Sequence, residues 1–419
     1  MVVGAGGGRL SRFVNAGTFR SLKNGTFRLY WGALLCQMAS MNMQMMARSL
    51  LIYRITGSAA VLGMISLFHA VPMLFLSLFG GVIADRLPKK YIMLAGQAGS
   101  MLVSLVVALS LVTGYLSEEH GSSWWILAVT SVFQGTIMGL MMPSRQSVLP
   151  EIVGEEQLLN AVSLGNVGTS GMRLLAPAAA GFLIGEFGFA AVYFTMTAMY
   201  GLAVILMALL PITGTTTLRG AGALADIKEG VKYLRHQTTI LFILGFTLFA
   251  VVLSMPYMLL MPIFVDDILK VGAEGMGILM SVSGAGAIVS SLVLASLPNK
   301  KRGLLLMISC LVMAVALIGF ALSELWPLSL GLIVFVGMGQ TGRMTLGNTL
   351  IQYYVDEQYR GRVMSIYMME FGLTSFGTFA AGVMAEAWGV QYIVGGFAAG
   401  LVLISILSLI FVRRIRTLD

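Results

Sequence analysis

The sequence has few charged residues for its length. Asp, Glu, Lys and Arg make up 11% of its 419 residues, 58% are hydrophobic, and the mean hydropathy is +0.89. A water-soluble protein carries about 25% charged residues because its surface must be hydrated. The scarcity of charge therefore excludes a soluble enzyme, a nucleic-acid-binding protein and a disordered scaffold, and predicts an integral membrane protein.

Residues that bind metals or form disulfides are scarce as well. The chain has two cysteines and three histidines, and Cys36 and Cys310 both lie in apolar runs, not in a CxxC pair. Neither a disulfide framework nor a metal site is expected from this set. The phosphate-binding pattern GxxxxGK[ST] is absent, which excludes a nucleotide site of that type. We expect no cofactor, no metal and no catalytic residues, and hence a protein that is not an enzyme.

Long apolar runs dominate what is present. A helix needs roughly 20 apolar residues to cross a bilayer core about 30 Å thick, whereas strands of a membrane barrel alternate over about ten. The runs have helical length and are separated by short polar segments. They predict twelve transmembrane helices near residues 29–53, 60–84, 91–116, 124–149, 160–184, 189–211, 238–262, 275–297, 303–324, 327–350, 363–386 and 390–412.

Basic residues are distributed unevenly between the polar segments. Most of them fall on one side, in the N-terminal tail and in segments such as Lys300-Lys301-Arg302, whereas the other side has Arg54, Lys270 and several acids. Basic loops of membrane proteins stay in the cytoplasm. We therefore expect a multi-pass protein of the plasma membrane with both termini cytoplasmic. The net charge of +8 reflects this topology and not an affinity for nucleic acid.

Glycine spacing indicates that the chain contains two similar parts. Gly63 opens the second run as Gly277 opens the eighth, and Gly181 ends the fifth as Gly382 ends the eleventh. Two packed six-helix repeats leave internal symmetry of this kind in a sequence. The fold class that we expect is all-α, with twelve transmembrane helices in two pseudo-symmetric six-helix bundles.

A polar interval separates the two parts. Its segment 223–234 has helical apolar spacing, which we interpret as an amphipathic helix on the inner membrane surface. The expected organisation is an N-terminal cytoplasmic tail (1–27), a six-helix bundle (28–211), a cytoplasmic linker (212–237), a second six-helix bundle (238–412) and a C-terminal cytoplasmic tail (413–419).

The segment GVIADRLPKK at 81–90 resembles the GxxxDRxGRR/K loop between the second and third spans of the major facilitator superfamily. The resemblance implies the major facilitator fold and a gate that locks the cytoplasmic side in the outward-open state. Pro88 stands where the motif has Gly, which changes the turn and keeps the charges. An ordinary basic inner loop is the alternative. The gating residues would be Gly81, Asp85, Arg86, Lys89 and Lys90.

Three further segments, 142–151, 173–181 and 360–368, are similar to the branch of that superfamily that includes the enterobactin exporter and macrolide-efflux proteins. The segment 173–181 contains Pro177 and Gly181 in a run similar to the GPxxGG signature of antiporters. We expect these residues to take part in gating by tight packing against the eighth span, or to pack there without such a role. Ser131 stands where the RxxQG signature of proton-coupled drug antiporters has Arg, which puts their coupling mechanism in doubt here.

Ionisable residues inside the spans are functional candidates because burying a charge in lipid costs at least about 2.5 kcal/mol. Glu370 is the acid placed well inside a span, and we interpret it as the proton-coupling residue or as a fixed partner of Arg343. His69 is a second coupling candidate, with structural packing as the alternative. Arg48, Arg173 and Arg343 are candidates for contact with an anionic substrate or for structural pairing. Met45 and Met258 are candidates for an apolar cavity lining, with a lipid-facing filler role as the alternative.

The predicted function is secondary active export of small amphipathic organic molecules, drug-like or siderophore-like, by alternating access and proton antiport. The resemblance implies a central cavity lined by spans 1, 2, 4, 5, 7, 8, 10 and 11. Import of a nutrient or lipid by symport is the first alternative, and a non-transporting receptor or scaffold is the second. The expected partners are the substrate, protons or another coupling ion, and the lipid bilayer, and we expect a monomer.

Overall fold

The structure is a computed structural model made of helices and short connections. It describes residues 20–117, 120–211, 223–298, 300–416 and 418. Within these ranges, the side chains of residues 78–86, 146–147, 155, 223–228, 371 and 414–415 are not described.

The helices form two halves joined by α7 (Ala223–Leu234). The N-terminal half contains η1 (Arg20–Lys23), α2 (Gly25–Thr56), α3 (Ala59–Arg86), α4 (Lys89–Val112), η2 (Gly121–Trp124), α5 (Trp125–Val153) and α6 (Glu155–Ala208). The C-terminal half contains α8 (Thr238–Ser254), α9 (Pro256–Leu259), α10 (Met261–Ile263), η3 (Phe264–Ile268), α11 (Gly272–Ser296), α12 (Arg302–Leu322), α13 (Trp326–Tyr354), η4 (Glu357–Tyr359), α14 (Arg360–Trp388), α15 (Val390–Phe411) and α16 (Arg413–Arg416).

Twelve segments cross the bundle, as the apolar runs predict. Eight helices of the described chain are long and apolar enough to span a membrane. One of them, α6, contains two crossings because it turns at Gly188, whose φ of 79° is outside the helical range. The other three crossings are α2, α13 and α14, which are 32, 29 and 29 residues long. These three helices are less apolar, and they carry Arg48, Arg343 and Glu370 in their interiors.

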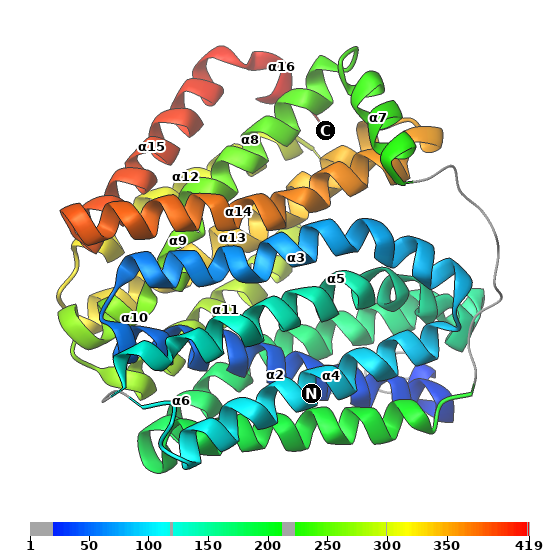
Figure 1. Ribbon diagram of the computed structural model, residues 1–419. Coiled ribbons are helices and arrows are strands. Elements are labelled where there is room, and N and C mark those ends of the chain that lie inside the picture. The colour runs from blue at the N-terminus through cyan, green and yellow to red at the C-terminus, as the bar shows by residue number, and fades with distance from the viewer. Residues whose placement is uncertain (1–19, 118–119, 212–222, 299, 417, 419) are drawn as a thin grey trace, which may run out of the picture.

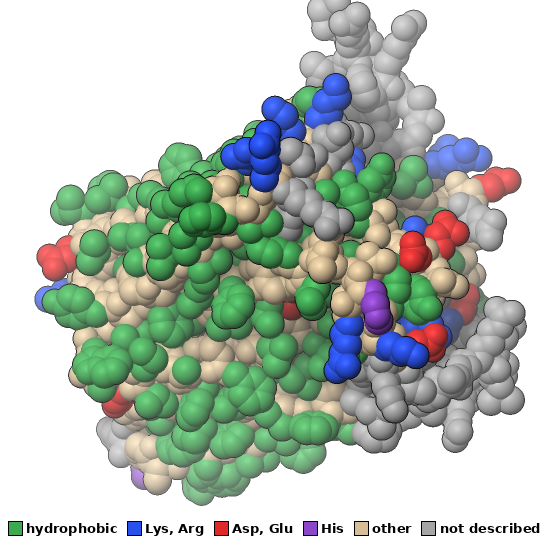
Figure 2. Space-filling model, turned by 90° about the horizontal axis from the view of Figure 1, so that it is seen from above, with side chains coloured by type: hydrophobic (Ala, Val, Ile, Leu, Met, Phe, Trp, Pro, Cys, Tyr) green, Lys and Arg blue, Asp and Glu red, His purple; other side chains and the backbone are tan. Residues whose placement is uncertain are grey.

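The two halves lie side by side with their helices roughly parallel to one long axis (Figure 1). We call one end of the bundle the acidic end, because Asp266, Asp267 and Glu386 lie there. We call the other the basic end, where α3 and α13 finish and α7 and α16 lie, toward the right and top of Figure 1. In the view of Figure 2, Lys and Arg gather at the basic end, and hydrophobic side chains cover most of the surface between the ends.

Two helix pairs join the halves, α3 with α14 and α6 with α11. Each pair meets at glycines. A Cβ built on Gly181 would lie 3.1 Å from Gly277 Cα, and one built on Gly382 would lie 3.2 Å from Gly63 Cα. The glycines whose spacing indicates internal symmetry are therefore the points where the halves touch, since a missing side chain lets two backbones approach closely.

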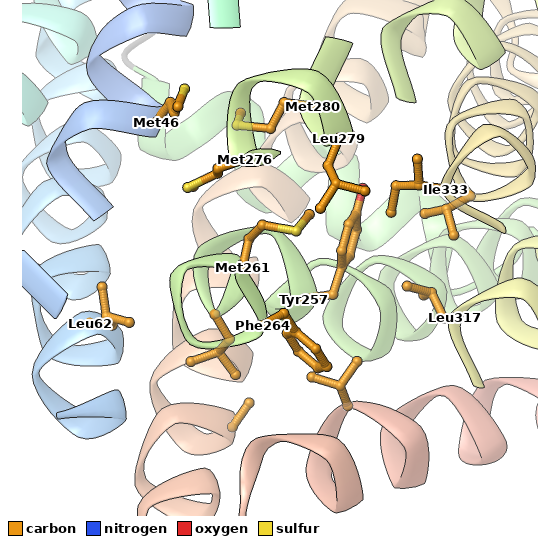
Figure 3. Close-up of a cluster of buried hydrophobic side chains, with 14 of the residues drawn as sticks. Met46, Leu62, Tyr257, Met261, Phe264, Met276, Leu279, Met280, Leu317 and Ile333 are labelled. Atoms are coloured by element: carbon orange, nitrogen blue, oxygen red, sulfur yellow. The ribbon is translucent and has the colours of Figure 1, made fainter. Parts of the chain in front are cut away.

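A buried apolar cluster seals the interior toward the acidic end. Figure 3 shows Met46 of α2 and Leu62 of α3 on one side, and Met261 and Met276 of the C-terminal half on the other. All four side chains are at most 1% exposed. Methionine side chains adapt to irregular gaps, so the cluster packs closely although its members come from both halves.

Candidate functional site

An ion pair joins the halves at the acidic end. Arg54, near the end of α2, donates from Nε to Asp266 Oδ2 at 2.9 Å and from Nη2 to Asp266 Oδ1 at 3.2 Å. The neighbouring Tyr53 hydroxyl donates to Asp267. Asp266 and Asp267 lie in η3, one turn of π-helix that follows α10. A two-point contact between a guanidinium and a carboxylate fixes orientation as well as distance.

A second acidic residue bridges the halves at the same end. Glu386, near the end of α14, accepts hydrogen bonds at Oε2 from Ser58 Oγ at 3.0 Å and from the Ala60 backbone nitrogen at 3.2 Å. Ala60 is in the first turn of α3, where free backbone N–H groups and the helix dipole favour an anion. Together with the Arg54–Asp266 pair, this contact closes the acidic end between the two halves. We call these contacts the acidic-end gate.

The described lysines of the 81–90 motif bind within their own half. Lys89 pairs with Glu151 of α5, and Lys90 donates from Nζ to the carbonyl oxygens of Ala208, at 2.8 Å, and Leu210. Lys90 thereby satisfies carbonyls at the end of α6, where a cation is favoured. The backbone of Gly81, Asp85 and Arg86 belongs to α3, and the side chains of these residues lie outside the described part of the structure.

The amphipathic segment forms α7, which packs on the C-terminal half at the basic end. Arg362 of α14 pairs with Glu229 at 3.0 Å, and the rings of Tyr233 and Tyr359 stack with centroids 4.2 Å apart. The Asp356 backbone nitrogen donates to the Tyr233 hydroxyl at 3.3 Å.

Glu370 and Arg343 lie together inside the C-terminal half. Arg343 is 3% exposed and Glu370 is 6% exposed. Their closest charged atoms, Arg343 Nη1 and Glu370 Oε2, are 3.9 Å apart. The Thr247 hydroxyl of α8 donates to Glu370 Oε1 at the shorter distance of 2.6 Å. The carboxyl group is therefore held by one neutral donor and one loosely paired cation.

Arg173 joins the halves near the middle of the bundle. It lies on α6 and donates from Nη2 to Gln340 Oε1 of α13 at 2.9 Å, and Gln340 in turn contacts Met255 Sδ at 3.2 Å. The structure brings Pro177 and Gly181, also on α6, against α11. A Cβ on Gly277 would lie 2.5 Å from the Pro177 carbonyl oxygen.

Arg48 and His69 lie in the interior of the N-terminal half. Arg48 Nη1 donates to Ser131 Oγ at 3.3 Å, so the serine that replaces the signature arginine binds an arginine from another helix. His69 is half-buried on α3 and lies within electrostatic range of Arg48. The remaining candidates, Met45 and Met258, are half-buried against the apolar cluster that seals the acidic end.

Sequence reasoning identified the buried ionisable residues and missed the acidic-end gate. In the sequence, Arg54 and Asp266 are charged residues that mark one side of the membrane. Glu386 lies near the end of an ordinary helix. Only the docking of the halves brings them together. Thr247 was missed because a threonine in a span usually donates to its own helix, as Thr247 also does to the Ile243 carbonyl oxygen at 2.9 Å.

Solved structures with this arrangement are transporters. The chain superposes on a crystal structure of the nucleoside transporter NupG with a TM-score of 0.73 and 11% identity, covering 92% of this chain and 99% of that chain. It superposes on a bacterial homologue of the lysosomal transporter Spinster with a TM-score of 0.65 and 14% identity, covering 93% and 95%. At these identities the likeness shows the fold.

Sequence relatives share most of the chain. The Staphyloferrin A transporter of Staphylococcus aureus is 24% identical over 337 residues, which cover 80% of this chain and 83% of that protein. Macrolide efflux protein A of Streptococcus pyogenes is 24% identical over 349 residues, covering 80% and 84%. Residues 16–419 match the family described as transmembrane secretion effector. The chain therefore belongs to this family of the major facilitator superfamily, and it is a transporter and not an enzyme.

Proposed function

We propose that the protein exports small amphipathic organic molecules across the plasma membrane by alternating access, coupled to the entry of protons. Both termini then lie in the cytoplasm, the acidic end faces outward, and one chain is sufficient for transport. The transported molecules are drug-like or siderophore-like in size and character.

The observation that carries this proposal is the closure of the bundle at its acidic end. There, Arg54 and Glu386 bind partners in the opposite half. A transporter that alternates needs contacts between halves that form at one end at a time. The acidic-end gate has this property, since its polar contacts are partly exposed and break without burying an unpaired charge.

Proton coupling is assigned to Glu370. Its carboxyl group is the described acid that is buried within a span, and its partners are the Thr247 hydroxyl and Arg343. A carboxyl group held away from water can take up and release a proton near neutral pH. Protonation of Glu370 would release Arg343 from the ion pair. Through Arg343, the proton would then change the contacts inside the C-terminal half.

Export is favoured over import by the relatives. The family description names secretion, and one relative is named as an efflux protein. Import by the same fold remains the competing outcome of the test below, because alternating access runs in either direction with its gradients.

The test uses membrane vesicles of both orientations that contain the protein. Inside-out vesicles with an acidic lumen should accumulate one or both of two fluorescent amphipathic probes, the cation rhodamine 6G and the anion 8-anilinonaphthalene-1-sulfonate. Filtration followed by fluorescence of the extracted dye measures the accumulation. Collapse of the pH gradient should abolish it, and vesicles that contain Glu370→Gln should exchange dye without concentrating it.

Other outcomes would contradict the proposal. Accumulation of dye only in right-side-out vesicles would show import. Absence of gradient-driven movement of both dyes would remove the assignment as an exporter of amphipathic molecules. A Glu370→Gln variant that still concentrates dye would show that another group carries the proton.

A further inference from the structure

Arg48 is an interior cation with little compensation. It lies on α2 eight residues before the end at Thr56, about 12 Å along the helix. Among the described residues its guanidinium makes one hydrogen bond, to Ser131 Oγ, and no ion pair. Ser131 is neutral and donates its own proton to the Leu127 carbonyl oxygen at 2.6 Å. The guanidinium therefore has several N–H donors that no described protein group uses.

No acid of the N-terminal half whose side chain the structure describes pairs with Arg48. Glu151 pairs with Lys89, Glu156 lies at the start of α6, and Glu186 lies near the turn of α6 at Gly188. In the C-terminal half, Glu370 is held by Thr247 and Arg343. A cation inside a membrane protein normally pairs with an acid or with backbone carbonyls. Among the described residues, Arg48 has neither partner, which favours a compensating anion that binds from outside the chain.

Two further polar groups close to Arg48 lack partners. The Tyr193 hydroxyl, on the second crossing of α6, belongs to a side chain that is 1% exposed and has no hydrogen-bond partner among the described residues. The same holds for Nδ1 of His69. Both residues interact electrostatically with Arg48. A buried polar atom without a partner is costly, so such atoms gathered around an uncompensated cation favour the binding of an anion there.

We propose that Arg48, Tyr193 and His69 form a subsite for the anionic group of the transported molecule, an inference that rests on the proposed export function. The ligand class is an amphipathic organic anion, with a carboxylate or sulfonate as the charged group. A guanidinium binds a carboxylate through two parallel hydrogen bonds, and the Tyr193 hydroxyl supplies a third donor. His69 Nδ1 adds a fourth in the neutral tautomer whose proton is on Nδ1.

The side chains of Arg48 and His69 keep partial exposure although both residues lie inside long helices, which favours access to the subsite. The second arginine of the interior that contacts no acid, Arg173, binds the neutral Gln340. It adds positive potential along the same bundle interior. The interior as described therefore favours an anionic molecule over a neutral or cationic one.

The first test needs no ligand and compares two arginines that differ in pairing. Arg48→Met should leave the melting temperature of the purified protein unchanged or raise it, because it removes an uncompensated buried charge. Arg343→Met should lower it, because it leaves Glu370 buried without its cation. In a Cys36→Ser background, unfolding can be followed through the buried thiol of Cys310, which a thiol-reactive dye labels only when the protein opens. A loss of stability in Arg48→Met equal to that in Arg343→Met would show a structural role and overturn the proposal.

The second test uses three probes that separate charge from shape. 2-Naphthoate should raise the melting temperature of the wild-type protein more than the neutral 2-naphthamide, and more than sodium chloride at the same concentration. Arg48→Gln should bind 2-naphthoate at least about tenfold more weakly. Arg48→Lys should retain part of the effect. Arg145→Gln, which removes another arginine of the same half, should retain all of it.

Several results would overturn the subsite. The first is an equal rise in the melting temperature of the wild type with 2-naphthoate and with 2-naphthamide. The second is an equal rise with chloride, which would indicate a site for inorganic anions. The third is undiminished binding of 2-naphthoate by Arg48→Gln. The dye assay separates this inference from the export function. Transport of rhodamine 6G without 8-anilinonaphthalene-1-sulfonate would leave export intact and remove the anionic subsite, whereas transport of neither dye would remove export itself.

Discussion

The acidic-end gate should set the balance between the two conformations of the bundle. Asp266→Asn removes the negative charge that Arg54 binds through two hydrogen bonds. Glu386→Gln replaces the carboxylate that holds Ser58 and the first turn of α3. Both substitutions keep the size of the side chain, so they weaken the contacts between the halves and leave the packing of each half unchanged.

The expected magnitude follows from the exposure of these groups. The side chains of Arg54 and Asp266 are 29% and 20% exposed, so solvent screens the pair, and it contributes about 1 kcal/mol. The hydrogen bonds of Glu386 contribute a similar amount, about 1 kcal/mol. Each substitution should therefore shift the ratio of open to closed acidic ends by about fivefold. The two contacts lie on different helices, so their effects should multiply to about 25-fold in the double variant.

Spin labels at the acidic end measure this ratio. Tyr115 and Leu325 are 57% and 65% exposed and lie in opposite halves, so labelled cysteines there report the separation of the halves. Double electron–electron resonance should show a longer-distance population that grows in each single variant and dominates in the double variant.

A matched control removes a carboxylate that does not bridge the halves. Glu357 is 92% exposed and pairs with Arg360 within the C-terminal half. Glu357→Gln should leave the distance distribution unchanged. If the double gate variant also leaves it unchanged, the bridging contacts do not stabilise the closed acidic end, and the reasoning from geometry to gating is wrong.

Two other substitutions give distinct outcomes. Gly277→Ala places a methyl group 2.5 Å from the Pro177 carbonyl oxygen, so the halves cannot close fully and the long-distance population should grow. Gly245→Ala, which meets nothing within 4 Å, is the control, and a short distance retained in both variants would contradict the contact. Thr247→Val removes the hydroxyl that binds Glu370 at 2.6 Å and should shift the external pH at which half-maximal dye accumulation occurs. An unchanged pH profile would show that this hydrogen bond does not tune the coupling group.

The fold could be predicted from the sequence because its signals are local. Apolar runs of helical length predict the twelve crossings, since each run reports its own burial in lipid. The spacing of the glycines also predicts the internal symmetry of the two halves. The structure explains this spacing, because Gly63 and Gly277 occupy equivalent points of contact between the halves. These positions tolerate no side chain, so their spacing is preserved in both halves of one sequence.

The site could be predicted only in part. Glu370 and Arg343 were identified as possible partners because an ionisable residue inside a span is conspicuous in any apolar run. The pairing of Arg54 with Asp266 could not be predicted, because the residues are 212 positions apart and each is unremarkable in its own segment. Their meeting depends on the relative position of two docked bundles, which no local pattern encodes.

The two glycine contacts have the geometry of an isologous interface, in which each partner offers the same patch to the other. Span two of one half meets span eleven of the other half, and span eight meets span five in the same way. Docking therefore requires no covalent link between the bundles. Since α7 packs on the C-terminal half, a chain divided between Leu210 and Ala223 should reassemble when its two pieces are produced together. The same geometry fits descent from a single six-helix ancestor that functioned as a symmetric dimer.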